Sequence, residues 1–180
     1  LHRRRHSFPT RRSSDLAAGM QSGSPFYHFE NKQALLGAVI LEGMQRAVTR
    51  QKAAMDRASE AAGNSPPDPR QQLRVLIRTH FDVLLGPDSE FIPVMLYEWR
   101  SLTAMQRAAV NDLRRSYEGM WVAPLQALVA AGAVSGDPAL ARLMIFGALN
   151  WSVQWFDPGQ RATLDDLTDT AINLFLKQPA

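Results

Sequence analysis

Hydroxyl, imidazole and ammonium groups gather near the start of the chain in residues 23–32, GSPFYHFENK. Tyr27, His28 and Lys32 carry the kinds of side chain that commonly hold phosphates in proteins that bind nucleic acid. Two phenylalanines are interleaved with them, so the block could instead be an aromatic cluster beneath the helix that follows. The stretch therefore leaves two interpretations, phosphate contact and simple packing.

The residues just before this block have the pattern of a helix followed by a tight turn. Ala17 and Ala18 can end one helix, Gly19 can supply the positive φ of a turn, and residues 21–29 can form a short second helix. Two helices joined in this way make a helix-turn-helix, whose second helix enters the major groove of DNA. The pattern predicts a DNA-reading head.

Residues 17–36, AAGMQSGSPFYHFENKQALL, resemble the recognition region of TetR-type transcriptional repressors. The family pattern is Ala-Gly-Val-Ser, two variable positions, a small residue, Leu-Tyr-x-His-Phe and x-x-Lys-x-x-Leu. The resemblance implies phosphate contacts for the tyrosine and histidine of the aromatic block, and a reach to the DNA backbone for the lysine. The residues that it assigns to DNA contact are Ser22, Gly23, Ser24, Pro25, Tyr27, His28 and Lys32.

This resemblance is incomplete at its amino-terminal side. Gln21 replaces the usual serine cap and Pro25 replaces a leucine, which the first turn of a helix tolerates. The family also has further helices before Ala17, where this chain has the segment LHRRRHSFPTRRSSDL. We expect residues 1–16 to be a disordered or foreign tail in place of the missing helix, with a basic arm that follows phosphates as the alternative.

The charge of the chain is concentrated in this tail. The formal net charge is +3 and the isoelectric point is about 9.7. Residues 1–16 hold five arginines and one aspartate, which leaves 15 basic and 16 acidic residues in the rest of the chain. Residues 17–180 are therefore almost neutral, and the basicity of the whole chain does not argue for nucleic-acid binding.

From Lys32 onward apolar residues recur at spacings of three and four, which predicts helices almost everywhere. Asn31 is the expected N-cap of the first, Asp137-Pro138 opens another, and Thr163 with Asp166 is spaced as a capping box. No stretch alternates as a strand would, so we expect an all-α protein. The expected helices are residues 32–62, 70–85, 89–100, 103–131 with a kink at Pro124, 138–155 and 164–176.

The proline-rich segment GNSPPDP, residues 63–69, predicts a boundary between two units. Residues 17–62 would form a partial helix-turn-helix head with its connecting helix. Residues 70–178 would form a ligand-binding and dimerisation domain.

Residues 97–121 and 147–167 resemble the branch of TetR-type regulators that senses acyl-CoA thioesters in fatty-acid and sterol catabolism. A pocket in such a bundle needs apolar walls and a few polar anchors, although the same residues could be ordinary core. Glu98, Arg100, Arg114 and Tyr117 could hold a polar head group or form surface ion pairs. The expected ligand-binding residues are Phe81, Met95, Leu96, Trp99, Arg100, Tyr117, Met120, Trp121 and Leu125.

The last two helices carry apolar faces that can pair with those of a second copy. Two such faces form a four-helix bundle in an isologous dimer, which would set two reading heads on a palindromic operator. An intramolecular core without dimerisation is the alternative. The expected interface residues are Leu143, Phe146, Asn150, Trp151, Trp155, Leu167 and Phe175.

Several other classes of protein are disfavoured. The chain has no cysteine, so disulfides and thiolate chemistry are excluded, and a reducing, cytoplasmic setting fits. No run of the sequence approaches the length of about 20 apolar residues that is needed to span a bilayer. Its histidines (His2, His6, His28 and His80) form no metal-binding or catalytic spacing, and no glycine-rich phosphate loop is present. We therefore expect no enzyme, no metal and no cofactor.

These observations together predict a ligand-responsive transcriptional repressor of the TetR type. A homodimer would bind double-stranded DNA and leave its operator when a small apolar ligand, with acyl-CoA as the class that the resemblance suggests, enters the carboxy-terminal bundle. The competing interpretation is an all-α ligand-binding or interaction protein without a role on DNA.

Overall fold

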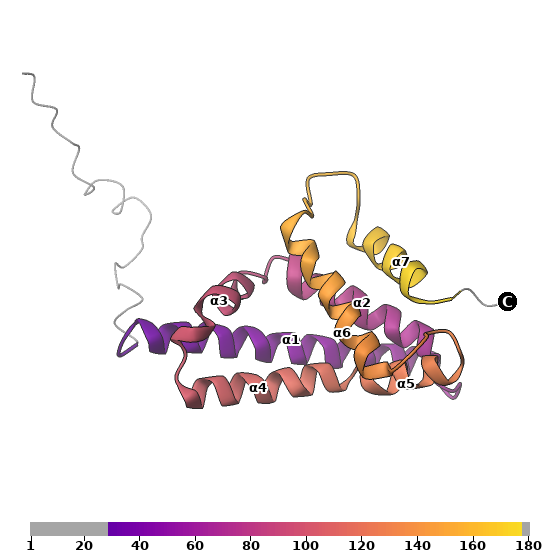
Figure 1. The fold of residues 1–180 in the computed structure, drawn as a ribbon, viewed down its shortest axis with the longest axis horizontal. Coiled ribbons are helices and arrows are strands. Elements are labelled where there is room, and N and C mark those ends of the chain that lie inside the picture. Colours follow the sequence, from indigo (N-terminus) through magenta and orange to yellow (C-terminus); the bar gives the residue numbers. More distant parts are fainter. Residues whose placement is uncertain (1–28, 178–180) are drawn as a thin grey trace, which may run out of the picture.

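The computed structural model describes residues 29–177 (Figure 1). Within this range the chain is helical and has no strand, which confirms the all-α expectation. The elements in chain order are α1 (Lys32–Ala62), α2 (Pro69–Leu85), α3 (Phe91–Glu98), η2 (Trp99–Ser101), α4 (Ala104–Gly119), α5 (Val122–Ala130), α6 (Pro138–Asn150), η3 (Trp151–Gln154) and α7 (Leu164–Phe175), where η marks a 3-10 helix.

Local capping groups set the ends of the long first helix. The side chain of Asn31 accepts a hydrogen bond from the backbone N–H of Ala34 at 2.8 Å, and α1 then runs for 31 residues. It ends at Gly63, whose φ of 59° lies in the region that favours glycine. Both limits agree with the prediction for residues 32–62.

Other helix starts follow the same local chemistry. Asp68 and Asp137 each cap a helix whose first residue is proline, and the Asp137 carboxylate accepts from two backbone N–H groups at 2.9 Å. Gly132 and Gly136, with φ of 72° and 89°, form the turn between α5 and α6. The predicted starts of α2 and α6 are therefore correct to within one residue.

One expectation, a continuous kinked helix over residues 103–131, is wrong. The chain forms two helices, α4 and α5, with a break at Met120 and Trp121. The ring of Pro124 has no N–H for the carbonyl of Met120 and clashes with that group in a continuous helix. The interruption therefore falls four residues before the proline, and α5 starts two residues ahead of it. The helices predicted over 89–100 and 138–155 also finish as 3-10 turns.

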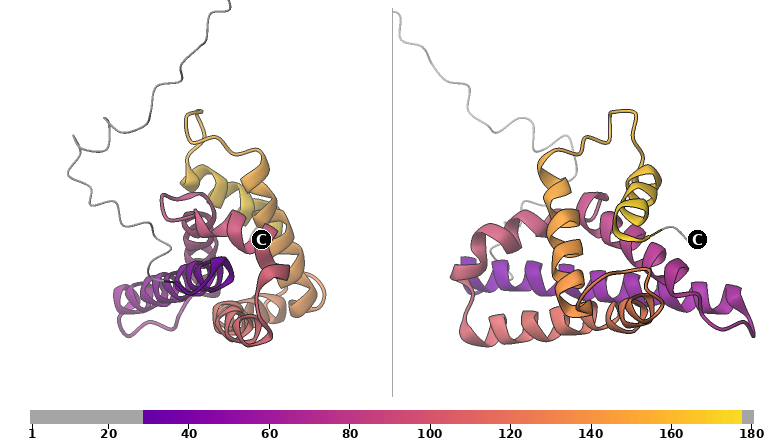
Figure 2. Two further views of the ribbon diagram at one scale, coloured as in Figure 1. Left: turned by 90° about the vertical axis from the view of Figure 1, so that its left-hand side faces the viewer. Right: turned by 45° about the vertical axis from the view of Figure 1, so that its right-hand side comes forward.

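The helices α1 and α4 run side by side in the same direction, and α2 lies between α1 and α7 (Figures 1 and 2). Two glycines allow this close packing on α1. A Cβ atom at Gly37 would overlap the side chain of Gln106 in α4, and one at Gly43 would overlap the ring of Phe91 in α3. The helix predicted to connect two units is thus packed along its length against α2, α3 and α4.

Buried side chains form two clusters that share α2. The α1-side core joins α1 to α3 and α4 and comprises Ile40, Met44, Ala47, Val83, Leu84, Phe91, Ile92, Leu102, Val110 and Tyr117. The α7-side core joins α2 to α5, α6 and α7 and comprises Leu73, Leu76, Ile77, Phe81, Trp121, Leu125, Leu128, Val134, Ile145, Leu149, Ala171, Ile172 and Leu176.

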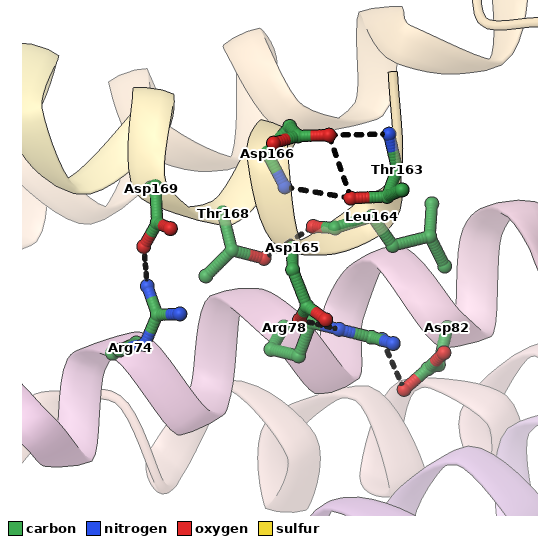
Figure 3. Close-up of polar contacts among 9 residues, drawn as sticks. All are labelled: Arg74, Arg78, Asp82, Thr163, Leu164, Asp165, Asp166, Thr168 and Asp169. Atoms are coloured by element: carbon green, nitrogen blue, oxygen red, sulfur yellow. Dashed lines mark hydrogen bonds and ion pairs between the residues drawn. The ribbon is translucent and has the colours of Figure 1, made fainter. Parts of the chain in front are cut away.

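Ion pairs on the surface align α7 with α2 (Figure 3). Arg74 pairs with Asp169, and Arg78 Nε lies 2.7 Å from an oxygen of Asp165. The start of α7 has the predicted capping box, in which Thr163 and Asp166 bond each other's backbone N–H groups. Exposed pairs contribute little to stability, so these contacts mainly set the position of the helix.

Candidate functional site

A cavity of about 450 Å³ lies within the α1-side core. It is lined by residues of α1, α2, α3, η2, α4 and α6, and its surface is largely apolar. Apolar concave sites with a few polar groups are typical binding sites for small molecules. The lining residues are Met44, Ala47, His80, Val83, Leu84, Phe91, Ile92, Met95, Leu96, Trp99, Val110, Arg114, Tyr117, Glu118, Phe146 and Asn150.

Three polar side chains from different helices meet at one side of this cavity. The His80 Nδ1 atom lies 2.9 Å from the hydroxyl of Tyr117, and its Nε2 atom lies 3.0 Å from the Oδ1 atom of Asn150. The ring of Phe146 stands edge-on to the imidazole, with centroids 4.9 Å apart. We call His80, Tyr117 and Asn150 the polar triad.

Burial keeps the triad uncharged near neutral pH. Loss of hydration lowers the pKa of His80 from 6.5 to about 4, although the hydrogen bond that His80 donates to Asn150 opposes this shift. The same loss of hydration raises the pKa of the Tyr117 hydroxyl. At pH 7 the imidazole and the phenol are therefore both neutral.

A cluster of charged side chains lies beside the triad. Glu118 accepts a hydrogen bond from Arg142 and lies 3.6 Å from the Nε atom of Arg114. Both guanidinium groups therefore share one carboxylate. Within the part of the lining that the structure describes, Arg114 is the only cation.

A buried glutamine links α1 to the break between α4 and α5. The Nε2 atom of Gln51 donates to the backbone carbonyl of Tyr117 at 2.8 Å, and its Oε1 atom accepts from the indole of Trp121 at 3.1 Å. In a continuous helix the N–H of Trp121 would donate to the Tyr117 carbonyl, but it donates to Glu118 instead. The side chain of Gln51 therefore supplies a donor where the helix ends.

Four of the expected ligand-binding residues, Met95, Leu96, Trp99 and Tyr117, line the cavity. The other five lie elsewhere. Phe81, Trp121 and Leu125 are buried in the α7-side core, and Met120 packs against that core. Arg100 is exposed on η2. The break before Pro124 accounts for Met120, Trp121 and Leu125, because residues on either side of it do not continue one helical face.

Sequence reasoning did not assign His80 or Asn150 to the cavity. A signal was available for the histidine, since it falls on the apolar face that Leu73, Leu76 and Leu84 define at spacings of three and four. A polar residue on such a face is buried with a partner or faces a cavity. Asn150 offered no comparable signal, because the α6 sequence has apolar residues on most sides.

Most of the residues expected to contact DNA lie outside the described range. Ser22, Gly23, Ser24, Pro25, Tyr27 and His28 belong to this group, as does the 1–16 tail. Lys32 is the first residue of α1, and its side chain is exposed. Their role on DNA stays a prediction.

The residues expected at a dimer interface divide into two groups. Leu143, Trp151 and Trp155 are 57%, 67% and 56% exposed. Phe146 and Asn150 line the cavity, although Asn150 is also exposed, while Leu167 and Phe175 pack partly against the α7-side core. Helices α6 and α7 carry three further exposed apolar side chains, Leu140, Met144 and Leu174. We call Leu140, Leu143, Met144, Trp151, Trp155 and Leu174 the apolar strip.

Two other kinds of feature are absent from residues 29–177. This part of the chain has no group of three or more metal-ligating side chains. It also has no helix that combines the length and the hydropathy needed to cross a membrane.

Comparison with known proteins agrees with this architecture. The model of the tetracyclin repressor-like, C-terminal domain family matches residues 66–178. The fatty acid metabolism regulator protein of Bacillus subtilis is 25% identical over 166 residues, which cover 88% of this chain and 79% of that protein. The HTH-type transcriptional repressor KstR2 of Rhodococcus jostii is 25% identical over 171 residues, which cover 89% and 76%.

A solved structure is also similar over most of the chain. The crystal structure of superantigen PfiT superimposes with a TM-score of 0.71 and 35% sequence identity, covering 91% of this chain and 83% of that one. One of the two relatives above is named a metabolism regulator and the other a transcriptional repressor. The chain therefore belongs to the TetR family, and residues 66–178 form its tetracyclin repressor-like carboxy-terminal domain.

Proposed function

We propose that the protein is a ligand-responsive transcriptional repressor that leaves its operator when a small, mostly apolar molecule enters the cavity. The observation that carries this proposal is the position of the cavity against α1. Met44 and Ala47 of α1 form part of its wall, so the helix that leads to the predicted DNA-reading head touches the ligand space directly.

The contacts of Phe91 offer a route from the cavity to α1. Its ring lines the cavity and also rests on Gly43, where no side chain separates the two helices. A ligand that displaces this ring therefore presses on α1. Such a ligand releases DNA only if it binds the DNA-free conformation more tightly than the DNA-bound one.

The apolar strip supports a dimer as the DNA-binding form. Large apolar side chains gathered on α6, η3 and α7 are costly to leave in water and are typical of an interface. Pairing of the strip with that of a second copy gives an isologous contact and sets two heads at the spacing of a palindromic operator. A repressor of this kind works in the cytoplasm, where the operator DNA is, and needs no catalytic group.

Apart from the polar triad and one ion pair, the lining suits a hydrocarbon body. Met44 and Met95 supply flexible side chains that adapt to ligand shape. An acyl chain fits this lining, and an acyl-CoA thioester is the class that the sequence resemblance suggests. The relative named as a fatty acid metabolism regulator agrees with such a ligand.

Titration of the complete natural protein against the DNA upstream of its own gene tests this proposal. We expect a sequence-selective complex whose affinity falls with salt. Lys32→Ala should weaken binding to all sequences alike and reduce the salt slope by about one. Lys52→Ala is the matched control, because Lys52 is exposed on the same helix and pairs with Asp56 at 2.8 Å. The absence of a selective, salt-sensitive complex would contradict the proposal.

The second candidate is a protein-binding role without DNA. It is favoured by the 35% identity to a protein described as a superantigen. This alternative predicts that Lys32→Ala leaves every interaction of the protein unchanged. Loss of operator affinity in that variant, with normal folding, would exclude it.

A further inference from the structure

The hydrogen bonds of the polar triad have a defined direction. With the Oδ1 atom of Asn150 facing it at 3.0 Å, the Nε2 atom of His80 must carry the proton. Since the imidazole is neutral, its Nδ1 atom is then an acceptor and takes the hydrogen of the Tyr117 hydroxyl at 2.9 Å. Each ring nitrogen is thus committed to a protein partner.

This arrangement leaves specific groups for a ligand. The phenol oxygen of Tyr117 has used its hydrogen and keeps its lone pairs, so it can only accept. The carboxamide of Asn150 has used its oxygen on His80, so its NH₂ group is the donor that remains. A carbonyl oxygen can accept from this NH₂ group, and a hydroxyl can also donate to the phenol oxygen.

The surrounding charges disfavour an anionic head group. Glu118 lines the cavity beside Tyr117, and a ligand carboxylate would enter the field of this carboxylate. Arg114 and Arg142 both already pair with Glu118. Because the pKa of His80 is about 4, the imidazole adds no positive charge at pH 7 to offset the desolvation of an anion.

We infer that the cavity selects apolar ligands with an uncharged oxygen at the head, either a carbonyl held by Asn150 or a hydroxyl held by Asn150 and Tyr117, and rejects the corresponding carboxylates. This inference rests on the proposed function, since it specifies the chemistry of the same ligand site.

A matched pair of probes separates the two kinds of head group. Methyl decanoate and decanoate share an acyl chain and differ in charge, so their dissociation constants at pH 8 can be compared by calorimetry. Tryptophan emission gives a second measurement, because Trp99 lines the cavity. We expect the ester to bind at least about tenfold more tightly, since a buried anion without a free cation loses its hydration.

Variants assign the preference to these side chains. Glu118→Gln should reduce the ratio of the two dissociation constants to about threefold or less, because it removes the carboxylate and frees the cations that pair with it. Asn150→Leu should weaken binding of the ester about fivefold, because it removes the donor that meets the ester carbonyl. Tyr97→Phe is the matched control, because Tyr97 is 80% exposed on α3 and lies outside the cavity lining. Its ratio should equal that of the wild type. Circular dichroism identifies any variant that fails to fold. If one variant fails, the binding data of the other variant test the inference.

Three results would overturn the inference: decanoate binding as tightly as the ester, no saturable binding of the ester, or folded variants in which Glu118→Gln leaves the ratio unchanged or Asn150→Leu leaves the ester affinity unchanged. The titration contains no DNA, so its outcome is separate from that of the operator experiment. A preference for decanoate would reject the uncharged head group and leave the repressor proposal intact. Failure to bind operator DNA would reject that proposal, and the ester preference could still be measured.

Discussion

The indole Nε1 atom of Trp121 donates a hydrogen bond to the Oε1 atom of Gln51 across 3.1 Å, and neither residue has any exposed surface. The other end of the same amide holds the backbone carbonyl of Tyr117. One side chain of α1 therefore satisfies two buried polar groups at the break between α4 and α5. The phenol of Tyr117 in turn belongs to the polar triad, so this contact joins α1 to the wall of the cavity.

Replacement of this glutamine should destabilise the fold. Gln51→Leu leaves the Trp121 indole and the Tyr117 carbonyl buried without partners, which we expect to lower the free energy of unfolding by about 2–4 kcal/mol. Chemical denaturation measures the change. Gln45→Leu, on the exposed side of the same helix, is the control and should differ from the wild type by less than about 0.5 kcal/mol. Equal stability of the two variants would contradict the assigned role of Gln51.

The close approach of α1 and α3 should not tolerate a side chain. Gly43→Ala places a methyl group on the ring of Phe91, and the strain should exceed the gain in helix propensity, with a net loss of about 1–2 kcal/mol. Gly119→Ala, which meets no atom within 4 Å, should be neutral or stabilising.

A double-mutant cycle tests the cause of this loss. Phe91→Leu combined with Gly43→Ala should recover part of the stability, because the smaller side chain leaves room for the methyl group. Strictly additive effects of the two substitutions would show that the overlap is not the source of the strain.

His80 should make the fold less stable in mild acid. Its pKa is about 4 in the folded protein and 6.5 in the unfolded chain, so the unfolded chain binds more protons between these values. The contribution is fully present above pH 6.5 and is lost as the pH falls through this window. Between pH 7.5 and 4.5 the loss should be about 2–3 kcal/mol.

The variant His80→Gln isolates the contribution of His80 to the pH dependence of stability. Its free energy of unfolding should fall less over the same pH range, because glutamine does not titrate, and urea denaturation at several pH values measures both slopes. The histidines at positions 2, 6 and 28 are present in both proteins and cancel in the comparison. Parallel pH profiles would contradict the buried, neutral state of His80.

Charges placed on the apolar strip should separate the proposed dimer. Leu143→Glu with Trp151→Glu puts four carboxylates into the interface of two copies, where desolvation and repulsion oppose association. Analytical ultracentrifugation should show the mass of a dimer for the wild type and of a monomer for the variant. Met105→Glu, at an 82% exposed position on α4, should remain a dimer. A wild type that sediments as a monomer at all concentrations would contradict the interface.

Local sequence determined where most helices begin. Asn31, Asp137 and Thr163 act on N–H groups two or three residues further along, so their effect does not depend on the rest of the fold. Gly63 likewise ends α1 through its own φ. For this reason the limits of α1, α2 and α7 and the start of α6 could be predicted from the order of residues.

The break between α4 and α5 was only half predictable. Pro124 indicates that the hydrogen bonding of the helix is interrupted near this residue, and we therefore expected a kink. A complete break leaves the carbonyl of Tyr117 without its helical donor, and Gln51 supplies a replacement from another helix. The contact of Gln51 with the Tyr117 carbonyl therefore accompanies the break between α4 and α5, which the local sequence could not distinguish from a kink.

The candidate site depended on tertiary structure to a greater degree. The apolar face of α2 could be recognised from its spacing. Met95, Leu96 and Trp99 were expected as apolar walls of a helical bundle, and all three line the cavity. The polar triad joins His80 to residues 37 and 70 positions away in the sequence. Periodicity shows that a side chain points inward, whereas the packing of α2, α4 and α6 decides which inward side chains meet around a cavity.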